Sequence, residues 1–114
     1  MSHIARLSDE WHEETAVARL EGEIDASNVV DIGQRLRSMV SNRSFALVVD
    51  LSSIAYVDSA GINLLFALGE EMRSRQQELA IVVRDGSPIA RMISLTGLDR
   101  AVSTHATLEE ALAA

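Results

Sequence analysis

Apolar and polar residues alternate over two short stretches near the start of the chain, residues 4–8 and 16–21. Such alternation predicts two strands, and the polar stretch 9–14 between them is typical of a solvated hairpin connection. Two later runs, residues 45–51 and 79–83, are short, continuous and rich in Val. That composition predicts two strands buried in the middle of a sheet.

Between these strands the apolar period becomes helical. Apolar residues recur every three to four positions over 29–40 and again over 60–75, which predicts two amphipathic helices. Asp25 or Ser27 is the expected N-cap of the first helix. The helical period divides the second helix into an inner face of Ile62, Leu65, Phe66, Gly69 and Met72 and an outer face of Ala60, Asn63, Leu64, Ala67 and Glu71. Glu71 is also spaced for an ion pair with Arg75 along the same helix.

The last third of the chain carries clear helix boundaries. Ser and Pro at 87–88 predict a helix start with a serine cap, and Gly97 predicts its left-handed end. Residues 107–110 form a capping box for a short final helix, with an edge strand expected near 101–102. The alternation predicts a single α/β domain over 1–114, with a mixed, mostly parallel sheet, an N-terminal antiparallel hairpin and about four helices packed on it.

The charge balance and the missing residue types narrow the function classes. Ten Lys+Arg against 17 Asp+Glu give a formal net charge of −7, which argues against direct binding of DNA or RNA. The chain contains no Cys, which excludes disulfides and thiolate catalysis, and all its basic residues are Arg, which excludes a phosphate-binding lysine. No apolar run reaches the roughly 20 residues needed to cross a bilayer. We therefore expect no membrane insertion and a cytoplasmic protein.

Functional sites of open α/β sheets lie beyond the carboxyl ends of the strands, where loops lead into helices. The most informative segment follows the central strand, which we expect to end near Asp50, and reads Asp-Ser-Ala-Gly over 58–61. At a helix start, unpaired N–H groups and the positive end of the dipole favour an anion beside Ser59. Gly61 leaves the first turn without a side chain and permits close approach. From residue types alone, a simple helix cap is the competing interpretation.

Three segments carry a resemblance to a known family. Residues 48–61, which read Val-Val-Asp-Leu-Ser-Ser-Ile-Ala-Tyr-Val-Asp-Ser-Ala-Gly, resemble the signature of STAS domains, in particular the bacterial anti-sigma factor antagonists. Residues 20–28 resemble the second strand and following turn of that family, and residues 96–112 also fit. The similarity spans nearly the whole chain in the right order.

The resemblance implies a phosphorylation switch. In this family a partner kinase that is also the anti-sigma factor phosphorylates the serine after the aspartate, which is Ser59 here. The unphosphorylated antagonist binds that kinase and frees a sigma factor, and a metal-dependent serine phosphatase restores it. The family implies a partner contact for Asp25 and support of the serine by Asp58, whereas Ala60 departs from relatives with a second hydroxyl there. The predicted partner-binding residues are Glu23, Asp25, Asn28, Asp58, Ser59, Ala60, Gly61, Asn63, Leu64 and Ala67.

A phosphoryl group on Ser59 also has a physical basis as a switch. It adds about −1.5 to −2 charge at a helix N-terminus, whose backbone N–H groups are expected to receive it with little refolding. Asp58, Glu23 and Asp25 already make this surface acidic, so a partner that fits the neutral hydroxyl meets added bulk and charge. A penalty of about 2.7 kcal/mol weakens binding about a hundredfold.

Other interpretations can be weighed against this one. A receiver-like domain phosphorylated on Asp50 fits the topology. Such domains need a lysine at a strand end to hold the phosphoryl group, and this chain contains no Lys. An enzyme is not expected, since His3, His12 and His105 lack metal-binding spacing and no Gly-x-Ser-x-Gly occurs, and we predict neither a metal nor a cofactor. A STAS accessory subunit of a membrane transporter or scaffold complex would dock its partner through the same helix. Weak nucleotide binding near Ser59 also stays open.

Overall fold

The strands lie side by side in chain order and form one five-stranded sheet, β1-β2-β3-β4-β5. The computed structural model describes residues 6–40 and 45–114. The strand bounds are β1 (Arg6–His12), β2 (Thr15–Ile24), β3 (Ala46–Val57), β4 (Glu78–Val82) and β5 (Ser103–His105). β1 pairs antiparallel with β2, and the other neighbouring strands pair in parallel, which confirms the expected sheet. Ile4 and Ala5 of the predicted first strand lie outside the described residues.

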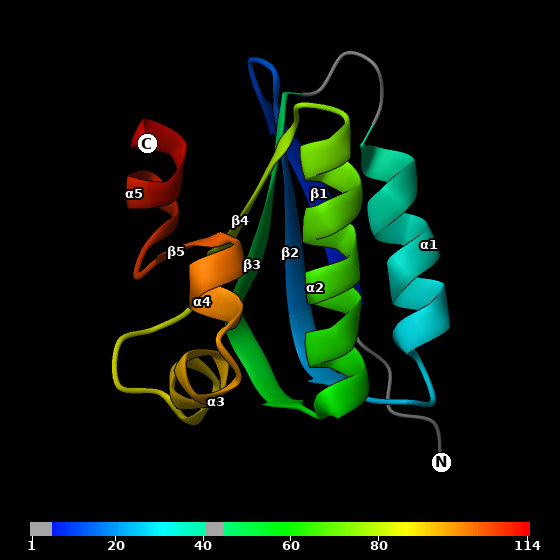
Figure 1. The fold of residues 1–114 in the computed structure, drawn as a ribbon, viewed down its shortest axis with the longest axis vertical. Helices are drawn as coiled ribbons and strands as arrows, with labels where there is room; N and C mark the ends of the chain where they lie inside the picture. Colours follow the sequence, from blue (N-terminus) through cyan, green and yellow to red (C-terminus); the bar gives the residue numbers. More distant parts are fainter. Residues whose placement is uncertain (1–5, 41–44) are drawn as a thin grey trace.

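The helices cover the two faces of the sheet unequally. In the described part of the chain they are α1 (Val29–Met39), α2 (Ser59–Ser74), α3 (Pro88–Thr96), α4 (Leu98–Ala101) and α5 (Leu108–Ala113). Because parallel crossovers are right-handed as a rule, strands in chain order place their connecting helices on one face. Side chains of α1 to α4 accordingly share the main core, and α1 and α2 stand side by side (Figure 1). Ala111 of α5 packs in a smaller core with Val17, Val48 and Val82.

Three strands run further than the sequence pattern predicts: β1, β2, which continues past residue 21 to Ile24, and β3. β1 continues to His12, so that the hairpin connection shrinks to Glu13 and Glu14. β1 lies at the edge of the sheet with largely exposed side chains, so its polar sequence is compatible with a strand. β3 continues past Asp50 to Val57, because its last residues pair with the end of β2 after shifts in register.

Two other boundaries also differ from the prediction. The edge strand predicted at 101–102 begins later, as β5, because the chain first forms the short helix α4. Asn28, rather than Asp25 or Ser27, precedes α1, and its side chain makes no cap hydrogen bond because it is used within the turn. The predicted caps of α3 are confirmed, and Thr107 caps α5 by accepting from the N–H of Glu110, while the Glu110 carboxylate reaches back to the N–H of Ala106.

The inner face of α2 is rotated slightly from the predicted one. Leu68 is buried in the main core, whereas Phe66, which was expected to face the sheet, is only partly buried. The main core therefore takes Ile62, Leu65, Leu68 and Met72 from this helix.

Candidate functional site

The ends of two adjacent parallel strands bring the predicted site residues together. β2 and β3 end side by side, with Ile24 paired to Val57. The chain leaves β2 through the turn 25–28 into α1, and it leaves β3 through Asp58 directly into α2 (Figure 1). Two segments far apart in the sequence therefore meet at one end of the sheet, beyond the carboxyl ends of its strands.

Asp58 holds this junction together through both carboxylate oxygens. Its Oδ1 accepts hydrogen bonds from the backbone N–H groups of Ala60 (2.9 Å) and Gly61 (3.2 Å), which makes Asp58 the N-cap of α2. Its Oδ2 accepts from the N–H of Ala26 (3.3 Å), and its own N–H donates to the carbonyl of Ile24 (3.1 Å). A cap ordinarily serves its own helix. Here the same carboxylate also fixes the turn before α1.

The turn 25–28 is held by its own side chains. Asn28 accepts a hydrogen bond from the Asp25 N–H through Oδ1 (3.0 Å) and donates to the Glu23 carbonyl through Nδ2 (2.8 Å). The Asp25 carboxylate accepts from both the N–H (2.9 Å) and the hydroxyl of Ser27. Glu23, Asp25 and Asn28 are thus brought to the junction as predicted, and Asp25 and Asn28 also shape the turn.

Ser59 is the first residue of α2, and its side chain is exposed. The helix start lies directly on the two strand ends, because Gly61 has no side chain. A Cβ at that position would lie 2.7 Å from Val57 Cγ1 and 2.9 Å from Ile24 Cγ2. The expectation of a serine hydroxyl at the mouth of a helix, open to solvent, is confirmed.

The outer face of α2 is less open than the helical period predicts. Asn63 is exposed, whereas Ala60 and Ala67 are half-buried. Leu64 is half-buried as well, because it packs toward α1: a Cβ added to Gly33 would lie 3.0 Å from Leu64 Cδ1. Leu64 therefore stabilises the contact between the two helices in addition to lining the outer surface.

The first turn of α2 differs from the expected phosphate cradle. The N–H groups of Ala60 and Gly61 are already bonded to Asp58, and the N–H of Ile62 donates to the Asp58 carbonyl (3.1 Å). A phosphate on Ser59 cannot use these donors unless the Asp58 carboxylate leaves them. That the N–H groups of this turn receive a phosphate with little refolding therefore stays a prediction, and for Ala60 and Gly61 it requires a rearrangement of the Asp58 carboxylate. A phosphoryl group that leaves the cap intact does not bond the N–H groups of Ala60 and Gly61.

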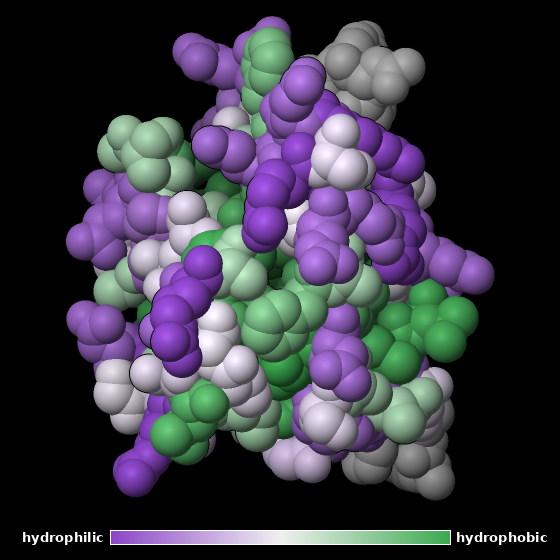
Figure 2. Space-filling model, in the orientation of Figure 1, coloured by the Kyte–Doolittle hydropathy of each residue, from purple (hydrophilic) through white to green (hydrophobic). Residues whose placement is uncertain are grey.

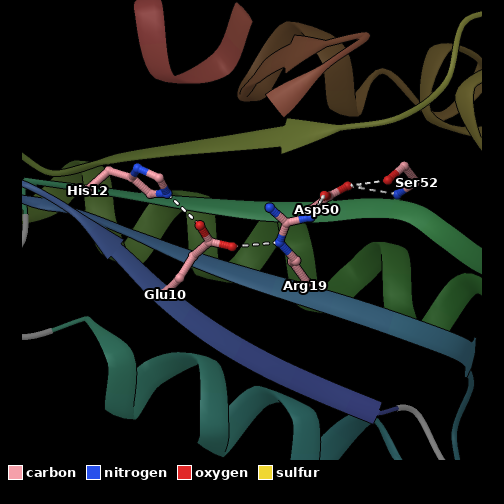
Figure 3. A network of polar contacts seen from close by, with 5 residues as sticks. All are labelled: Glu10, His12, Arg19, Asp50 and Ser52. Carbon is pink, nitrogen blue, oxygen red and sulfur yellow. Dashed lines mark hydrogen bonds and ion pairs between the residues drawn. The ribbon is translucent and has the colours of Figure 1, made fainter. Parts of the chain in front are cut away.

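A second polar cluster crosses β1, β2 and β3 on the sheet face opposite α1 and α2 (Figure 3). Glu10 accepts hydrogen bonds from His12 and from Arg19 Nε (2.7 Å), and these two bonds lower the pKa of its carboxyl. Arg19 Nη1 lies 3.9 Å from Asp50 Oδ2, and Asp50 Oδ1 accepts from the N–H and the hydroxyl of Ser52. Asp50 is 7% exposed and lies in the middle of β3. It is not at a strand end, as a receiver-like acceptor requires.

Two residues at or beside the junction were not among the predicted residues. The N–H of Ala26 donates to the Asp58 carboxylate, and a backbone donor cannot be predicted from side-chain types. Val30, beside the junction rather than part of it, is 70% exposed in the first turn of α1, and an apolar residue off the buried face of a helix is a signal that the sequence carries.

Residues 6–40 and 45–114 contain neither a candidate metal-binding cluster nor a helix that could span a membrane. No three His, Cys, Asp or Glu residues there are grouped so that they could hold a metal ion. None of the helices in those ranges combines the length and apolar character needed to span a membrane.

Known proteins resemble this chain in sequence and in fold. The family model described as "Mlab, STAS domain" matches residues 7–110. The anti-sigma-F factor antagonist RsfB of Mycobacterium tuberculosis is 33% identical over 101 residues, which cover 89% of this chain and 81% of RsfB.

Solved structures agree with the sequence match. The crystal structure of an anti-sigma factor antagonist from Mycobacterium paratuberculosis has a TM-score of 0.86 at 30% identity, covering 96% of this chain and 92% of that one. SpoIIAA in its unphosphorylated form (TM-score 0.73, 23% identity, 94% and 93% covered) and Bacillus SpoIIAA in its phosphorylated form (0.68, 24%, 94% and 96%) share the fold. With the Asp-Ser-Ala-Gly junction inside the matched region, the chain belongs to the STAS domain family.

Proposed function

We propose that the protein is an anti-sigma factor antagonist whose residues 1–114 act as one STAS unit. In its unphosphorylated form it binds an anti-sigma factor that is also a serine kinase, and this binding releases a sigma factor. Relatives with at least 30% identity that are named anti-sigma factor antagonists support this role. The protein acts by binding rather than by catalysis, and a serine phosphatase returns it to the binding state.

One observation carries the proposal: an exposed serine hydroxyl stands on the first residue of α2, where two loops meet. Asp58 fixes this position by capping the helix, and Gly61 allows the helix start to pack directly on the strand ends. The docking face consists of Ser59, Ala60, Asn63 and Ala67 on α2, together with Glu23, Asp25 and Asn28 beside it.

Phosphorylation of Ser59 is the proposed off-switch. The carboxylate of Asp58 bonds the N–H groups of Ala60 and Gly61, so a phosphate that leaves the cap intact lies on the exposed side of the helix start, where a partner docks. It adds about −1.5 to −2 charge next to Asp58 and Asp25. A partner that fits the neutral hydroxyl then meets both bulk and repulsion, and a cost of about 2.7 kcal/mol weakens its binding about a hundredfold.

The test compares Ser59→Asp with Ser59→Ala in binding to the purified cognate anti-sigma factor by isothermal titration calorimetry. Ser59→Ala is expected to bind like the wild type, and Ser59→Asp at least tenfold more weakly, because Asp adds charge but less bulk than a phosphate. Ser94→Asp is the matched control, since Ser94 is an exposed serine on α3 and gains the same charge elsewhere.

Equal binding by Ser59→Asp and Ser59→Ala would contradict the switch. If the wild type recovers membrane-transporter subunits from its host and binds no anti-sigma factor, the accessory-subunit alternative replaces the proposed function.

A further inference from the structure

A shallow groove of about 400 Å³ lies between α1 and the first two turns of α2, next to Ser59. Its walls are Val29, Val30, Gln34, Arg37, Ala60, Asn63 and Leu64. In Figure 2 the hydrophobic surface gathers over the half of this face where α1 and α2 begin, while the half where they end is hydrophilic. The groove therefore continues the docking face from α2 onto α1.

Within the apolar wall on α1, Val29 packs against the main core, whereas Val30 is not needed for packing within the chain. Val30 is 70% exposed, while Ile32 and Leu36 on the same helix are 1% and 0% exposed and supply its contact with the core. An aliphatic side chain left in water at the edge of a groove favours an aliphatic partner, because contact removes apolar area from water.

The charged residues around the groove indicate the charge of the partner segment that fits it. Residues 23–31 and 58–64 include four carboxylates, Glu23, Asp25, Asp31 and Asp58, and no Arg or Lys; Arg35 Nη1 lies 3.9 Å from Asp31 Oδ2 and offsets the charge of that one carboxylate. Arg37 lines the groove, but its Nε and Nη2 both donate to the Glu71 carboxylate (2.8 Å each), a pairing that lowers the pKa of Glu71. The rim is acidic overall, and basic side chains complement it.

We infer that the anti-sigma factor docks an aliphatic side chain flanked by basic residues into the groove between α1 and α2, with Val30 as a contact. This inference rests on the proposed function and extends its docking face to a helix that the sequence did not assign to the partner. Asp58 bonds both the turn before α1 and the first turn of α2, so it fixes the two helix starts that form the groove relative to each other.

The experiment measures the dissociation constant for the purified anti-sigma factor with Val30→Ser and with Leu95→Ser as its matched control. Leu95 is 78% exposed on α3 and lies outside the groove, so both substitutions remove an exposed aliphatic side chain from a helix. Val30→Ser is expected to weaken binding about tenfold and Leu95→Ser less than twofold. Thermal melting of both variants checks that the fold is retained.

A second pair of variants tests the charge of the partner. Gln34 is exposed in the groove, and Gln34→Arg is expected to weaken binding about fivefold, whereas Gln34→Glu keeps or tightens it. If Val30→Ser and Leu95→Ser bind equally while Ser59→Asp still weakens binding, the groove is not part of the interface and the proposed function stands. If Gln34→Glu weakens binding more than Gln34→Arg, the inferred basic flank is wrong. If the wild type does not bind an anti-sigma factor at all, the proposed function itself fails.

Discussion

Helices α2 and α3 each follow a strand and each begin with a capping side chain. The two caps differ in how many N–H groups they bond and in where those groups lie. Ser87 accepts one hydrogen bond, from the N–H of Ala90 in its own helix (3.1 Å). Asp58 bonds two N–H groups of its own helix and a third from the turn before α1. The difference follows from position: α2 starts where two parallel strands end side by side, so one carboxylate reaches two loops. A capping residue at such a junction organises a surface as well as a helix.

The two glycines near these helix starts give the largest expected contrast. Gly61→Val places a Cβ 2.7 Å from Val57 Cγ1 and 2.9 Å from Ile24 Cγ2, and both neighbours are stiff β-branched side chains in a core. We expect a loss of about 3 kcal/mol in the free energy of unfolding, measured by urea denaturation. Gly86→Ala meets nothing within 4 Å and suffers only from its φ of +74°, so about 1 kcal/mol is expected. Equal losses would mean that α2 does not depend on close approach.

Removal of the capping side chains of α2 and α3 compares the same two helix starts, with a smaller expected loss of unfolding free energy. Asp58→Ala is expected to cost about 2 kcal/mol of unfolding free energy and Ser87→Ala about 1 kcal/mol, since the aspartate serves more donors. Asp58→Ala should also speed amide hydrogen exchange at Ala26, which lies in another loop. If exchange at Ala26 is unchanged while α2 is destabilised, Asp58 is a local cap like Ser87.

Local signals in the sequence were sufficient for some elements and not for others. The start and end of α3 follow from Ser87, Pro88 and Gly97, because caps depend on neighbouring residues. The true end of β3 at Val57 depends on pairing with β2 after a shift in register, which no single segment encodes.

Contacts between helices were the main source of error along α2. Glu71 is spaced to pair with Arg75, and its carboxylate bonds Arg37 of α1 instead, while the charge of Arg75 adds a smaller lowering of the Glu71 pKa. Leu64 was assigned to the outer surface, and α1 covers part of it. Helical spacing describes neighbours on one helix and is silent about the neighbouring helix, so these contacts needed the fold.

The site itself was found partly by resemblance and partly by geometry. The Asp-Ser-Ala-Gly segment identifies Ser59 as the candidate acceptor, and the structure gives the exposure that this role needs. The occupied donors of Ala60 and Gly61 and the groove at Val30 could not be read from residue types, because each depends on side chains brought together by folding.

The most direct test of the account is to locate the phosphate. The purified protein and its Ser59→Ala variant are each incubated with the cognate anti-sigma kinase and ATP, and the products are mapped by peptide mass spectrometry. The account predicts one phosphate on Ser59 of the wild type and none on the variant. Equal incorporation into both proteins, or a phosphate on a different residue of the wild type, would contradict it.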